Sequence, residues 1–115
     1  MRLKTERDRT ELRLAALTRD FAAIVESVAM SPPDDEHDPE GATTAFERQQ
    51  LAALIDRARE HLVDVDRAGE RLRDGTYGGC ARCGRPIAPA RLEARPTATT
   101  CVACASTPAR VSARR

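Results

Sequence analysis

Apolar residues recur at alternating steps of three and four over residues 3–29, a stretch that contains neither glycine nor proline. This spacing predicts an amphipathic helix with one narrow apolar seam. The register continues toward the N-terminus through Leu3, Arg7 and Thr10, which are weaker seam residues. It ends at Pro32 and Pro33. The main seam positions are Leu14, Leu17, Phe21, Ile24 and Val28.

The same pattern returns over residues 44–74 and predicts a second helix of similar length. Thr44 and Glu47 have the spacing of a capping box, so we expect this helix to begin at Thr44. Gly75 stands where a glycine commonly ends a helix. The seam positions here are Leu51, Ile55, Ala58, Leu62, Val65, Gly69 and Leu72.

Neither stripe is wide enough to fold alone, but two helices of similar length can bury their seams against each other. The sequence therefore predicts a mainly α protein. An antiparallel coiled-coil helical hairpin is expected over residues 1–75, with its tip at 31–43. A separate small domain is expected over residues 76–115. The similar lengths favour pairing within a monomer, although the seams could also build a dimer.

Charge is divided unevenly along the chain. Residues 31–47 carry no lysine or arginine, whereas residues 80–115 hold seven arginines against Glu93 alone. The charged N-terminus does not resemble a signal peptide, and no apolar run is long enough to span a membrane, so we expect a cytoplasmic protein. The acidic residues of the middle segment are Asp34, Asp35, Glu36, Asp38, Glu40 and Glu47.

All four cysteines lie in two C-x-x-C pairs separated by 17 residues. This spacing is typical of a closed tetrahedral Zn²⁺ site, in which the metal is structural rather than catalytic. Residues 76–115 are therefore expected to form a small zinc-finger domain with four cysteine ligands and a basic C-terminal tail. A thioredoxin-like redox pair would need a strand–helix setting, which the nearby glycines and prolines do not favour. His37 and His61 are isolated from each other and are interpreted as surface residues. The predicted metal ligands are Cys80, Cys83, Cys101 and Cys104.

The cysteine segment closely resembles the zinc finger of the DksA/TraR family of bacterial transcription regulators. The resemblance implies a protein that binds RNA polymerase, inserts its hairpin into the secondary channel and modulates initiation, without recognising a DNA sequence itself. The matching motif residues are Gly75, Tyr77, Gly78, Cys80, Cys83, Gly84, Ile87, Arg91, Leu92, Ala94, Pro96, Cys101 and Cys104.

The resemblance also gives the acidic tip a role near the polymerase catalytic centre. The family's tip motif is Asp-x-x-Asp-x-Ala, and Asp38, Glu40 and Ala42 are the corresponding candidates for contact with the polymerase, although the spacing is not identical. Two positions that the resemblance links to the alarmone ppGpp hold Asp64 and Ala105 here. The sequence therefore does not predict that ligand.

Three other classes of function compete with this interpretation. The arginine-rich end could make the finger a nucleic-acid-binding or protein-interaction module that does not act on polymerase. The segment lacks aromatic stacking residues, however, and the acidic middle would repel nucleic acid. The helical seams could also serve a dimeric scaffold. An enzyme is not expected, because the sequence shows no nucleophile–base pair, phosphate-binding loop or open metal position.

Overall fold

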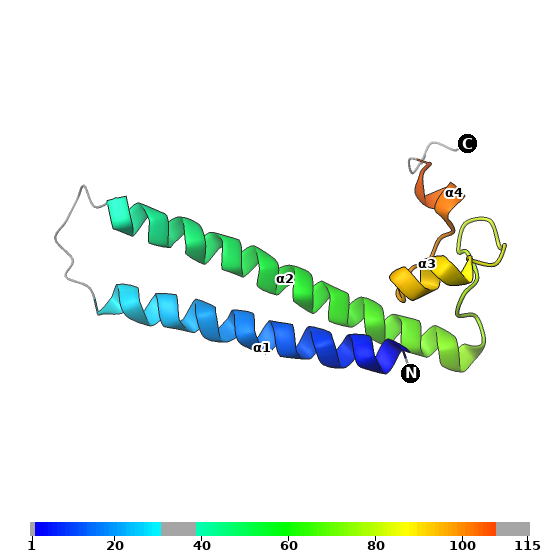
Figure 1. Ribbon diagram of the computed structural model, residues 1–115, viewed down its shortest axis with the longest axis horizontal. Coiled ribbons are helices and arrows are strands. Elements are labelled where there is room, and N and C mark those ends of the chain that lie inside the picture. The colour runs from blue at the N-terminus through cyan, green and yellow to red at the C-terminus, as the bar shows by residue number, and fades with distance from the viewer. Residues whose placement is uncertain (1, 31–38, 108–115) are drawn as a thin grey trace. The chain divides into compact units, whose positions relative to one another are not determined.

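The protein is mainly helical in the computed structural model, which describes residues 2–30 and 39–107, the side chains of residues 39 and 40 excepted. Helices α1 and α2 form the predicted antiparallel hairpin, and the cysteine-containing segment with two short helices follows it (Figure 1). Across these described ranges there is no strand, only an isolated bridge between Gly79 and Pro86. The helices are α1 (Arg2–Ala29), α2 (Pro39–Asp74), α3 (Pro89–Ala94) and α4 (Val102–Ala105).

The chain divides into two compact units. One consists of Arg7–Val63, and the other combines Met1–Glu6 with Asp64–Arg115. The first unit contains most of the hairpin, and the second contains the base of both long helices together with the finger. Among the described helices, none is long and apolar enough to cross a membrane.

Within Arg7–Val63 the seams meet as the sequence predicts, but they are only partly covered. Ile55 and Ala58 are buried, as is the polar side chain of Thr10. Two helices alone cover each seam from one side, so most of its other residues remain half-buried. Val28, a predicted seam position, is 44% exposed. The half-buried seam residues of this unit are Leu14, Leu17, Phe21, Ile24, Leu51 and Leu62.

Helix α2 begins at Pro39, five residues before the expected start at Thr44. The capping-box prediction was therefore wrong, because Thr44 and Glu47 lie inside the helix. Proline suits the first helical position, where its fixed φ matches the helix and its missing N–H needs no partner. Residues 39–43, which were expected to belong to the tip, accordingly form the start of α2.

The other end of α2 was predicted correctly. Gly75 takes a left-handed φ of 83°, which residues with a side chain rarely adopt. Its N–H donates to the Leu72 carbonyl at 3.3 Å, and the Thr76 N–H donates to the Arg71 carbonyl at 2.9 Å. This pair of bonds is a Schellman motif, which satisfies carbonyls that the end of the helix would otherwise leave unpaired.

The second unit has its own small core. Leu3 and Val65, both predicted seam residues, are buried there. Ala68 is fully buried at 0% exposure although the heptad register did not include it. Leu72, which the register did include, is exposed. In the finger the buried side chains are Cys80, Ile87, Pro96 and Ala98.

Candidate metal centre

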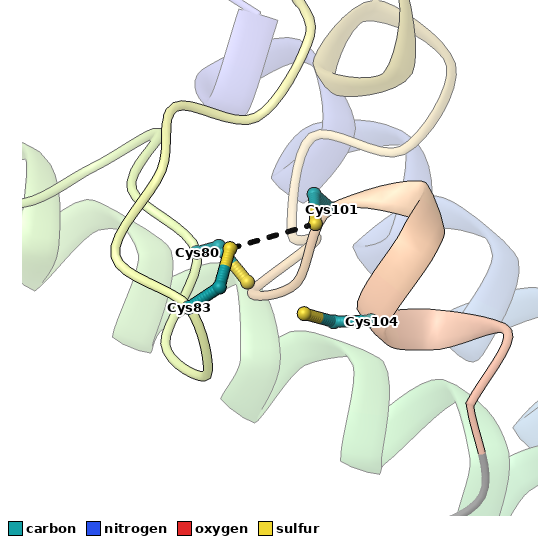
Figure 2. A group of neighbouring side chains, drawn as sticks. All are labelled: Cys80, Cys83, Cys101 and Cys104. Atoms are coloured by element: carbon teal, nitrogen blue, oxygen red, sulfur yellow. Dashed lines mark hydrogen bonds between the residues drawn. The ribbon is translucent and has the colours of Figure 1, made fainter.

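The first cysteine pair lies on a tight turn that is held by backbone hydrogen bonds. The Cys80 N–H donates to the Arg85 carbonyl at 2.8 Å, and the Gly84 N–H donates to the Cys80 carbonyl at 2.9 Å. Gly84 has a φ of 76°, so the turn needs a residue that tolerates the left-handed region. This geometry brings the sulfurs of Cys80 and Cys83 to the same side of the loop (Figure 2).

The second pair is positioned by a short helix. Cys101 precedes α4 and Cys104 lies within it, and the Ala105 N–H donates to the Cys101 carbonyl at 2.9 Å. A single helical turn therefore carries both sulfurs on one face. The two halves of the finger are joined beside the cysteines, because the Ala81 N–H donates to the Thr99 carbonyl at 2.8 Å.

The four sulfur atoms converge on one point. All lie within 4.8 Å of one another, and the Cys83 and Cys101 sulfurs are 3.8 Å apart (Figure 2). The four cysteines form no disulfide, because the distances between their sulfur atoms are far longer than an S–S bond. Zn–S bonds of about 2.3 Å in a tetrahedral site place the sulfurs about 3.8 Å apart. The donor set and its spacing therefore fit a closed Zn²⁺ site with four thiolate ligands.

Backbone N–H groups near the sulfurs favour thiolates over thiols. The N–H of Cys83, followed by that of Cys101, lowers the pKa of Cys80 to about 6. The N–H of Cys104 lowers the pKa of Cys101. In contrast, hydrogen bonds with the side chains of Cys101 and Cys80 raise the pKa of Cys104 to about 12, because they favour the protonated thiol. A metal would supply the positive charge that four adjacent thiolates require.

Several residues of the family motif hold the loop between the two cysteine pairs. The Tyr77 hydroxyl donates to the Pro96 carbonyl at 2.8 Å. The Arg91 Nε donates to the Thr100 carbonyl at 2.7 Å, next to Cys101. These bonds tie the start of the finger and α3 to the segment that leads into the second cysteine pair, which gives the motif residues a physical role.

Arg82 makes two further hydrogen bonds within the finger that the sequence did not predict. Its Nη1 donates to the carbonyl of Cys104 at 2.8 Å and to that of Thr107 at 3.2 Å. The side chain thus connects the first cysteine turn to the end of α4. From the sequence, Arg82 was interpreted only as part of the basic end of the chain, and its position between two cysteines gave no signal for this contact.

We expect Arg82→Ala to loosen the metal centre, since the carbonyls of Cys104 and Thr107 lose a charged donor. The loss should be about 1 kcal/mol, equivalent to roughly fivefold faster zinc transfer to a chromogenic chelator. Arg85→Ala is the matched control, because it removes the same charge from the same exposed loop but keeps the Arg85 carbonyl that Cys80 uses. Equal transfer rates for the two variants would contradict the bracing role.

The predicted tip residues are placed only in part. Asp38 lies outside the described residues. Glu40 lies in the first turn of α2, with its side chain not described, and Ala42 is exposed in the same helix. The structure therefore brings together the four cysteines but does not report on a joint arrangement of the tip residues.

Comparisons with known proteins agree with this architecture. Residues 75–107 match the model of the prokaryotic dksA/traR C4-type zinc finger. The chain is 53% identical over 61 residues to the RNA polymerase-binding transcription factor DksA of Caulobacter vibrioides. It is 44% identical over 66 residues to the uncharacterized protein YteA of Bacillus subtilis. These alignments cover 53% and 57% of this chain but only 43% and 28% of the two relatives, so the chain matches less than half of each.

A solved structure matches over a longer stretch. Transcription factor DksA2 from Pseudomonas aeruginosa superposes with a TM-score of 0.74 at 28% identity, covering 90% of this chain and 74% of that one. The fold and the cysteine site define a helical hairpin protein with a C4-type zinc finger. The finger resembles that of the DksA/TraR family, and the helices and finger together resemble the DksA2 structure.

Proposed function

We propose that the protein is an RNA polymerase-binding transcription regulator that acts as a cytoplasmic monomer. The observation that carries this proposal is the likeness to DksA2 over 90% of the chain, which includes the hairpin as well as the finger. A relative with 53% identity over the matched region is named as an RNA polymerase-binding transcription factor, which supports the same partner. No sequence-specific DNA recognition is part of the proposal.

Cys80, Cys83, Cys101 and Cys104 are proposed to bind one structural Zn²⁺. Their sulfurs lie within 4.8 Å of one another, and backbone N–H groups already favour thiolates at Cys80 and Cys101. With four thiolate ligands the metal has no position left for substrate or water, so its contribution is to the folding of the finger. The finger and the base of the hairpin then supply affinity for the polymerase.

The hairpin is proposed to enter the polymerase secondary channel with its acidic tip foremost. Helix α2 has 36 residues and measures about 54 Å along its axis at 1.5 Å per residue, long enough to reach into a deep channel. It begins one residue after Asp38, so Glu40 and Ala42 follow within its first turn. Carboxylates at this end of the helix could approach a basic, metal-containing catalytic centre and alter initiation.

The alternative, a nucleic-acid-binding finger, has less support. Arg82 and Arg91 use their guanidinium groups to hold carbonyls of the finger itself. Two of the seven arginines that suggested a phosphate-binding surface therefore have structural roles. Phosphate binding relies on cations that are exposed and available, so the charge count overstates the capacity of this segment.

Asp38→Asn combined with Glu40→Gln tests the role of the tip. The double variant removes two charges but keeps side-chain size and most of the hydrogen-bonding capacity. We expect it to bind core RNA polymerase as the wild type does, yet to lose its effect on transcription from a responsive promoter in a purified assay. Loss of binding would make the tip an affinity element instead, and an unchanged transcriptional effect would remove these carboxylates from the mechanism.

A further inference from the structure

A groove opens between α1 and α2 on the half of the hairpin nearer the tip. It has a volume of about 450 Å³. Its apolar lining is formed by half-buried side chains that the two helices leave incompletely covered, Ile24, Leu51 and Leu54 among them. The residues around it are Asp20, Ala23, Ile24, Glu47, Gln50, Leu51 and Leu54.

Two exposed apolar side chains extend this lining toward the tip. Phe46 lies four residues before Gln50 and eight before Leu54, so all three share one row along α2. Val28 lies four residues after Ile24 on α1 and continues its row in the same way. Phe46 is 60% exposed and Val28 is 44% exposed. Large apolar side chains that continue an open apolar groove mark a surface that a partner covers.

The charges of the groove restrict the partner. Asp20 and Glu47 are exposed carboxylates, and neither has an ion pair or hydrogen bond with a side chain in the described ranges 2–30 and 39–107. No basic residue lines the groove. Nucleic acid and anionic membrane surfaces would be repelled by these carboxylates, whereas lysine or arginine beside an apolar side chain would complement both parts of the groove.

We propose that this groove is a docking site for a segment of RNA polymerase that carries an apolar side chain flanked by lysine or arginine. The inference rests on the proposed function and identifies which face of the hairpin contacts the partner. The apolar side chain fills the space above Ile24, Leu51 and Leu54, next to Phe46, while its basic neighbours pair with Asp20 and Glu47. This contact is separate from the tip carboxylates, and it adds to the affinity that the finger and the base of the hairpin supply.

Binding of the full chain to core RNA polymerase, measured with a fluorescent label, tests the proposal. Phe46→Ala combined with Glu47→Gln should weaken binding about tenfold or more, as expected when an aromatic anchor and a charge leave an interface. The matched control is Leu12→Ala combined with Asp56→Asn, which removes one exposed apolar side chain and one exposed carboxylate from positions outside the groove. The control should bind within about twofold of wild type. Circular dichroism should show equal helix content, because Phe46 and Glu47 are exposed.

The outcomes separate the two proposals. If the wild type binds polymerase and the groove variant binds equally well, the docking site is overturned but the proposed function stays intact. Wild type that does not bind polymerase overturns both. A concentration-dependent dimer in sedimentation that the groove variant abolishes would show that a second copy of the chain occupies the groove, and this would also overturn the polymerase contact. Weaker binding by the groove variant alone supports the proposal.

Discussion

Removing metal with a chelator should unfold residues 76–107 while most of the helical signal remains. The finger buries only a few small side chains, and a structural Zn²⁺ typically contributes about 10 kcal/mol or more to the folding of such a segment. Helices α1 and α2 have 28 and 36 residues, against 6 and 4 in α3 and α4. The far-ultraviolet circular dichroism signal at 222 nm should therefore fall only slightly, whereas hydrogen exchange in the finger should become fast.

Cys83→Ser gives the same test without a chelator, because Cys83 is exposed and its replacement removes one thiolate with little loss of packing. We expect the purified variant to hold less than one zinc per chain and to show the same fast exchange in the finger. Metal analysis of wild-type protein that finds no zinc, after purification without chelators, would contradict the assignment of the four cysteines.

Ile55→Asp should have the second large effect. Ile55 is 7% exposed in the Arg7–Val63 unit, and an aspartate there would be buried without a partner. We expect a loss of about 3 kcal/mol or more in the free energy of unfolding, measured by urea denaturation followed at 222 nm. The half-buried seam residues Leu17 and Leu62 should give smaller losses for the same change, since solvent can reach the new carboxylate.

Val63→Asp provides the matched control in the same helix. Val63 is 46% exposed, so the substitution lowers helix propensity and changes charge in the same way but buries nothing. Its effect should stay within about 0.5 kcal/mol of wild type. If Ile55→Asp and Val63→Asp shift the unfolding midpoint equally, the seam of the hairpin is not where the structure places it.

The hairpin could be predicted because its signal is repeated along the chain. Alternating steps of three and four identified Ile55, Ala58 and Val65, all of which are buried. The start of α2 could not be found in the same way. Both Pro39 and the capping-box spacing at Thr44 are possible helix starts. A local pattern alone does not decide which of the two begins the helix.

The convergence of the four cysteines was predictable from the sequence, but the contacts around them were not. Two C-x-x-C pairs bring four sulfurs together because each pair spans one tight turn or one helical turn. The Arg82 brace depends instead on how the two turns are stacked, which no local spacing encodes. The groove was missed for a related reason: a heptad register marks Ile24 and Leu51 as seam residues but does not tell how completely the opposite helix covers them.

The central claim is that the hairpin carries its tip into RNA polymerase. The most direct measurement is cross-linking from residue 38 to core RNA polymerase, with a photoreactive amino acid in place of Asp38 and the cross-linked peptides identified by mass spectrometry. Cross-links should fall on polymerase segments that line the secondary channel close to the catalytic centre, and competition with unlabelled wild-type protein should suppress them. Cross-links confined to the outer surface of the polymerase, or none at protein concentrations that saturate binding, would contradict the account.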